Sequence, residues 1–176
     1  MKTVSVNLYS FDELSSSSKQ FAIDKYRYLF VEFDWSEPTI ESFIDKLNNE
    51  GFEDATIYYS QGSGASFEAD IDLARFIEFR ELDLLEAIDI AWAIVRSSTR
   101  CHERAKAVVY CGGSYPEELE ELIHSITNRI EKARLDFSRE IYNTLESEHD
   151  YRTSDEFVSE SLTEMGEVFL ESGKFF

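Results

Sequence analysis

The chain has 176 residues, of which 36 are acidic and 17 are basic, so its formal net charge at pH 7 is −19. A hydrophobic fraction of 43% with 14% aromatic residues can build a packed core, which excludes global disorder. The electrostatic potential of so negative a chain repels nucleic acid and anionic membranes. This excludes direct binding of DNA or RNA and favours a basic partner.

The first third of the chain predicts one strand followed by two helices. Residues 3–9 alternate apolar and polar side chains, which is typical of a half-buried strand. Residues 11–30 predict a helix with a serine N-cap, and residues 36–51 predict a second helix with proline in its first turn and glycine at its end. The expected inner-face residues are Phe21, Ala22, Tyr26, Leu29 and Phe30 in the first helix and Ile40, Phe43, Ile44 and Leu47 in the second.

The segments 52–59 and 65–73 predict two antiparallel strands of a hairpin. In the second strand, alanine, phenylalanine and isoleucine alternate with acidic and polar residues, so one face is expected to be buried. The other face carries an acidic strip of Glu68, Asp70 and Asp72, which we take as a candidate partner-binding surface.

The loop that joins these strands contains Gln61, Gly62, Ser63 and Gly64. Such a loop could hold a phosphate or could only turn the chain. A phosphate loop opens a helix and usually carries a lysine, whereas here a strand follows and no lysine is near. The pattern therefore predicts a hairpin turn, with anion binding or a partner contact as the alternative.

The second half of the chain predicts further helices and one strand. Residues 82–97 form an apolar segment expected to be a core helix, and 104–113 predict a strand. A long helix is expected over 116–148, and a final helix capped by Ser154 precedes a short strand or turn. Together these elements predict one α+β domain over residues 1–176, with a small antiparallel sheet covered by helices.

The expected long helix carries an apolar stripe at steps of three and four residues. Its members are Leu119, Ile123, Ile126, Ile130, Ala133, Phe137, Ile141 and Leu145. If the sheet covers only part of this stripe, the remainder forms a seam for a second copy, so a homodimer is expected.

No residue pattern indicates a metal, a cofactor or a catalytic group. Cys101, His102 and Cys111 lack the paired spacing of a zinc site, and two cysteines in a domain of this size do not indicate a disulfide framework. No nucleophile motif occurs, and carboxylate pairs are expected by chance among so many acids. Because no catalytic motif is present, we expect a protein that is not an enzyme. The N-terminus lacks a signal-peptide core, and no apolar run is long enough to span a membrane, so we expect a cytoplasmic protein.

The acidic residues concentrate in the last third, where residues 111–176 contain 16 acids and six bases. Glu117, Glu118, Glu120 and Glu121 occupy the expected first turn of the long helix, where negative charge also favours the helix dipole. The series continues with Glu146, Glu148, Asp150, Asp155, Glu156, Glu160, Glu164 and Glu167. Carboxylates on one face can imitate the phosphates of a duplex, and a merely solvated surface is the alternative.

Four segments resemble a family of small acidic proteins encoded by tailed bacteriophages, often labelled antitoxin-like. These are YSFDELSSSSKQFAIDKYR, DWSEPTIESF, SQGSGASF and YRTSDEFVSESLTEMGEVFLESGKFF. The resemblance covers about the first 72 residues and the last 26. Family members often carry aspartate where Ser63 stands, and further tryptophans before the loop. The resemblance implies a phage protein acting in the bacterial cytoplasm, and it assigns no active site.

Charge and resemblance together predict a non-enzymatic inhibitor of a host nucleic-acid-processing or defence complex, such as a CRISPR effector or a restriction complex. It would bind a basic host protein or nucleoprotein by imitating nucleic acid. The alternatives are an antitoxin-like partner of a basic toxin, and a phage accessory protein or enzyme without mimicry.

Overall fold

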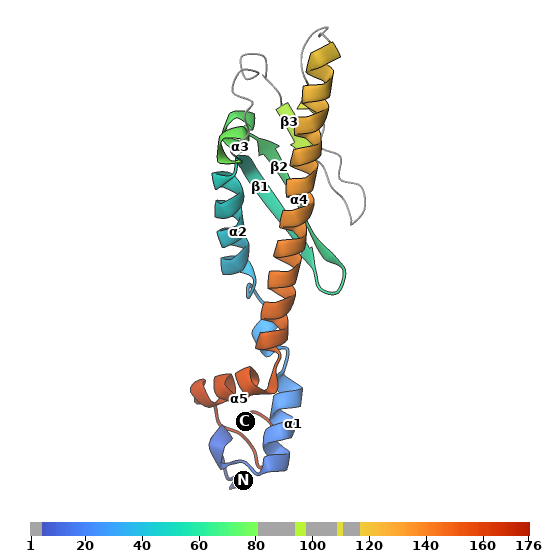
Figure 1. Ribbon diagram of the computed structural model, residues 1–176. Coiled ribbons are helices and arrows are strands. Elements are labelled where there is room, and N and C mark those ends of the chain that lie inside the picture. The colour runs from blue at the N-terminus through green and yellow to red at the C-terminus, as the bar shows by residue number, and fades with distance from the viewer. Residues whose placement is uncertain (1–4, 81–93, 98–108, 111–116) are drawn as a thin grey trace. The chain divides into compact units, whose positions relative to one another are not determined.

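The computed structural model describes residues 5–80, 94–97, 109–110 and 117–176, with side-chain surroundings for 5–80 and 124–176. These residues form an α+β fold with a small antiparallel sheet, as the sequence predicts (Figure 1). In chain order the elements are η1 (Phe11–Glu13), α1 (Ser16–Tyr26), η2 (Leu29–Val31), α2 (Glu37–Asn49), β1 (Phe52–Ser60), β2 (Gly64–Ile71), α3 (Leu73–Phe79), β3 (Ile94–Ser97), β4 (Val109–Tyr110), α4 (Glu117–Arg152) and α5 (Asp155–Glu164).

The chain divides into two compact units. Unit 1 combines residues 1–35 with 147–176, and unit 2 contains residues 36–146. Each unit has its own buried apolar residues. The single domain expected for 1–176 stays a prediction, which the cooperativity of unfolding can test.

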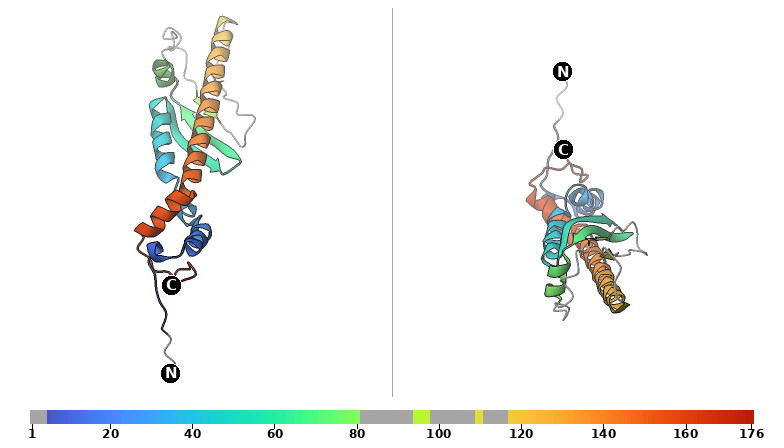
Figure 2. Two further views of the ribbon diagram at one scale, coloured as in Figure 1. Left: turned by 60° about the horizontal axis from the view of Figure 1, so that its bottom comes forward. Right: turned by 90° about the horizontal axis from the view of Figure 1, so that it is seen from above.

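The sheet belongs to unit 2 and has the strand order β1-β2-β3-β4, with antiparallel pairs throughout. The predicted hairpin is confirmed, because β1 pairs with β2 from Phe52 opposite Ile71 to Ser60 opposite Gly64. The long helix is also confirmed: α4 has 36 residues, about 54 Å at 1.5 Å per residue. Both views of Figure 2 show this helix crossing the sheet.

The core of unit 2 is centred on Phe52. Its ring centroid lies 5.5 Å from that of Phe67, 5.6 Å from that of Phe76 and 5.9 Å from that of Phe137, so β1, β2, α3 and α4 meet there. Among the α4 residues whose surroundings are described, the buried apolar ones are Ile126, Ile130, Ala133, Phe137, Ile141 and Leu145. These six members of the predicted stripe are internal core and do not form an open seam. Homodimerisation stays a prediction, without the support of these residues.

Unit 1 is built from both ends of the chain. Its core contains Phe11, Leu14, Ala22, Ile23, Val158, Leu162 and Phe169. Phe169 forms antiparallel bridges with Tyr9 and with Phe175, which confirms the short turn or strand expected at the end. The serine caps predicted for α1 and α5 are present, because the hydroxyls of Ser15 and Ser154 accept from backbone amides at the start of these helices. Ser36, also predicted as a cap, stands before α2 but its side chain makes no capping hydrogen bond.

Two predictions for the N-terminal segment were wrong. In the described part of the predicted strand 3–9, only Tyr9 pairs with another segment, and Val6 and Leu8 are 50% and 42% exposed. A strand needs a neighbour for its backbone groups, and Phe169 offers only one bridge. In α1, Phe21 is 43% exposed, because the side of the helix that packs on α5 carries Ala22 and Ile23 instead.

Helix boundaries were also predicted imperfectly. The single helix expected over 11–30 is divided into η1, α1 and η2, and Leu29, expected on its inner face, is 38% exposed. The expected core helix 82–97 is wrong at 94–97, which form β3; its other residues lie outside the described part of the chain. β-Branched Ile94 and Val95 suit a strand that has neighbours on both sides. The sequence reasoning also missed α3, although Asp72 followed by apolar residues at helical spacing is an N-cap signal.

Candidate functional site

The glycine loop holds an anion that belongs to the same chain. Glu146 on α4 accepts hydrogen bonds at Oε1 from the Gly62 backbone amide (2.9 Å) and from the Tyr59 hydroxyl (2.8 Å). Gly62 has φ 65° and Gly64 has φ 132°, angles that favour glycine. The prediction of a hairpin turn is therefore confirmed. The exposed amide of the loop binds a glutamate of the long helix, which sequence reasoning had counted only as surface charge.

Replacing Glu146 by alanine is expected to lower the free energy of unfolding by about 1.5–3 kcal/mol. The change removes the charged acceptor shared by Tyr59 and Gly62. Glu140→Ala is a matched control on the same helix. Its exposed ion pair with Lys46 is expected to contribute less than about 1 kcal/mol. Urea unfolding measures both variants, and equal losses would contradict an anchoring role for Glu146.

The predicted acidic strip on β2 is discontinuous. Asp70 is exposed, whereas Glu68 is half-buried and accepts a long hydrogen bond from the Tyr58 hydroxyl at 3.5 Å. Asp72 caps α3 by accepting from the Arg75 amide at 3.1 Å, and the same two side chains form an ion pair. The strip therefore offers one freely exposed carboxylate and one that helps to fold α3.

The four glutamates predicted at the start of the long helix lie within the first turns of α4, as expected. The side chains of Glu117, Glu118, Glu120 and Glu121 fall outside the described surroundings. Their part in partner binding stays a prediction.

A continuous row of carboxylates lies on α5. Glu156, Glu160 and Glu164 are spaced four residues apart and all are exposed. At 100° per residue, this row lies on the side of the helix opposite to the buried Val158 and Leu162. In the part of the chain that the structure describes, none of the three glutamates has an ion pair. We call these three residues the α5 carboxylate row.

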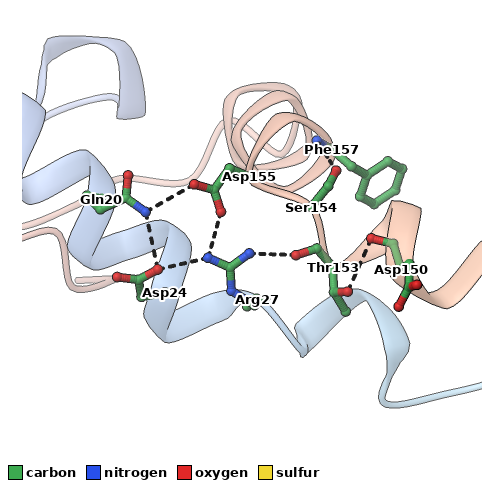
Figure 3. Close-up of polar contacts among 8 residues, drawn as sticks. All are labelled: Gln20, Asp24, Arg27, Asp150, Thr153, Ser154, Asp155 and Phe157. Atoms are coloured by element: carbon green, nitrogen blue, oxygen red, sulfur yellow. Dashed lines mark hydrogen bonds and ion pairs between the residues drawn. The ribbon is translucent and has the colours of Figure 1, made fainter. Parts of the chain in front are cut away.

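The helix that carries this row is held to α1 by an arginine (Figure 3). Arg27, the C-cap residue of α1, forms ion pairs with Asp155 at 2.6 Å and with Asp24 at 2.8 Å. It also donates a hydrogen bond to the Thr153 carbonyl at 2.6 Å. The hydrogen bond from Arg27, with a second from Gln20, lowers the pKa of Asp155 below its usual range. Asp155 therefore serves to position α5, and the row begins one residue later.

The acidic surface continues beyond α5. Residues 147–176 contain eight acids and two bases, and Glu167 and Glu171 are exposed after the helix ends. A second row of exposed carboxylates, formed by Glu37, Glu41 and Asp45, lies on α2 with the same spacing. The α2 row is not continued in this way, because Lys46 follows it directly and binds Glu140.

Metal sites and membrane-spanning helices are both absent from the described residues. No group of three or more histidine, cysteine, aspartate or glutamate side chains there could hold a metal ion. Likewise, none of the helices described has the length and apolar character required to cross a bilayer. The cysteines and His102 weighed as zinc ligands lie outside this part of the chain.

Comparison with known proteins finds no matching family model, no matching curated protein and no matching solved structure.

Proposed function

We propose that the protein is a phage-encoded acidic inhibitor that binds the basic nucleic-acid cleft of a host nucleic-acid-processing or defence complex. The observation that carries this proposal is the α5 carboxylate row, which is exposed along the side of α5 opposite to its buried face. The protein acts by occupying the cleft and not by chemistry of its own, in the cytoplasm of the bacterial host.

The row has the properties that a basic cleft recognises. Four residues of α-helix advance about 6 Å, so the row presents a regular line of negative charges on a rigid element. Nucleic-acid clefts bind their ligand mainly through lysine and arginine contacts to regularly spaced phosphates. Since the row lacks ion pairs with the described residues, binding would not have to break an internal salt bridge.

The proposal predicts that reversing the row to lysine (E156K/E160K/E164K) weakens binding to the host complex at least about tenfold at 0.1 M salt. The matched control is E37K/E41K/D45K, which makes the same change of net charge on the α2 row and also begins in a first helical turn. The control is expected to bind within about threefold of the unchanged protein, because its charges lie outside the proposed surface.

Two further measurements decide whether binding imitates nucleic acid, and a third identifies the partner. The affinity of the unchanged protein should fall with rising salt, and DNA or RNA should compete for the same site. Equal losses in the two triple variants would show that only net charge counts. Affinity purification with mass spectrometry identifies the partner, and recovery of a basic toxin would replace the proposal by an antitoxin-like function.

A further inference from the structure

A cavity of about 240 Å³ lies between the end of α3 and the middle of α4, within unit 2. Phe76 and Ala133, both buried, supply its apolar lining. Along the buried side of α4, Ala133 stands between the larger Ile130 and Phe137. A short side chain at this position leaves a space that a larger one would fill.

The polar lining of the cavity has the opposite charge to the rest of the chain. Its residues are Arg80, Arg129, Lys132 and Asp136, three cations against one carboxylate. The whole chain has 36 acids and 17 bases, so this excess of cations is local. Arg129, Lys132 and Asp136 are spaced three and four residues apart, which places them on one side of α4 with Ala133.

The cations of the cavity differ in their partners. Arg80 donates to Glu50 and lies 5.8 Å from the centroid of the Phe76 ring, so it is fixed in place. Asp136 pairs with Arg139 at 3.5 Å. Within the described residues, Arg129 and Lys132 have no ion pair, and two like charges three residues apart on a helix repel each other.

A buried cation follows directly on α4. Arg134 is 1% exposed, and its Nε and Nη1 atoms have no hydrogen-bond partner among the described residues. Burial lowers the pKa of Arg134 to about 10, so its guanidinium remains protonated at pH 7. The carboxylates of Glu131 and Glu68 partly counteract this effect of burial on the pKa of Arg134. At 100° per residue, Arg134 lies on the other side of α4 from Lys132 and Asp136, so it is not part of the cavity.

We propose that this cavity binds a small phosphate monoester. Arginine and lysine together suit a phosphate, because guanidinium groups donate in a planar fork and the ammonium adds a compact charge. The cavity has a volume of about 240 Å³. In liquid water, about eight molecules occupy this volume, at roughly 30 Å³ each. That space fits a phosphoryl group with a small apolar body against Phe76 and Ala133.

Isothermal titration calorimetry at constant ionic strength tests the proposal with two probes, inorganic phosphate and phenyl phosphate. Phenyl phosphate is expected to bind more tightly, because its ring adds contact with the apolar wall. The variant R129Q/K132Q changes two exposed side chains and is expected to weaken phenyl phosphate binding at least about tenfold.

The control variant K19Q/K25Q removes the same charge from α1 and should bind phenyl phosphate like the unchanged protein. Absence of binding at tens of millimolar probe, or equal weakening in the two variants, would overturn the proposal. Equal affinity for the two probes would overturn the proposal that the ligand is a phosphate ester, and would show that the cavity binds the phosphate group alone. Since the cavity is lined by residues of unit 2 and the α5 carboxylate row consists of residues of unit 1, the result does not depend on the inhibitory function.

Discussion

Replacing Phe52 by alanine is expected to destabilise the protein by about 3–5 kcal/mol, a large part of the stability of a typical domain. Phe52 is fully buried and touches three aromatic rings from β2, α3 and α4. The cavity left behind would open where all these elements meet. Urea unfolding followed by circular dichroism measures the loss.

Phe79→Ala supplies the matched control for this variant. Phe79 lies at the end of α3 and is 52% exposed, so the same substitution removes far less buried surface. The control is expected to change the free energy of unfolding by about 0.5 kcal/mol or less. A similar loss for Phe79→Ala would show that Phe52 is not the centre of this core.

Phe169→Ala is expected to lower the free energy of unfolding by a similar amount, about 3–5 kcal/mol, because it opens a cavity in the core of unit 1. Phe169 is fully buried, lies against the rings of Phe11, Tyr26 and Phe175, and bridges two chain segments through its backbone. The control is Phe33→Ala, since Phe33 is 81% exposed.

The pair Phe52→Ala and Phe169→Ala also tests the predicted single domain. If residues 1–176 unfold as one cooperative domain, both variants shift the same transition, whichever probe is used. Two transitions, each sensitive to only one of the substitutions, would show instead that units 1 and 2 unfold separately.

The parts of the fold that the sequence predicts well are those with a local physical signal. Alternation in 65–71, glycines with positive φ at 62 and 64, and a serine cap before α5 each specify structure within a few residues. The strand at 94–97 lacks such a signal. Its apolar residues fit a helix or a strand, and pairing with distant β2 and β4 decides between them.

The candidate site shows the same division between local and long-range information. The spacing of Glu156, Glu160 and Glu164 is visible in the sequence, but their exposure depends on which side of α5 packs in unit 1. The bond from Gly62 to Glu146 joins residues 84 positions apart, so no local pattern predicts it. Likewise, Asp72 looks like part of an acidic surface until its role as a helix cap is seen.

The way unit 1 combines Tyr9 and Phe11 with Phe169 and Phe175 has a consequence for synthesis on the ribosome. At about 5–20 residues per second, the N-terminal segment waits on the order of ten seconds or more before its partners are translated. During that time Phe11, Leu14 and Ile23 cannot bury themselves against α5. A nascent chain that stalls before Phe169 keeps these side chains accessible to chaperones and proteases, so unit 1 matures only after translation of the last helix and turn.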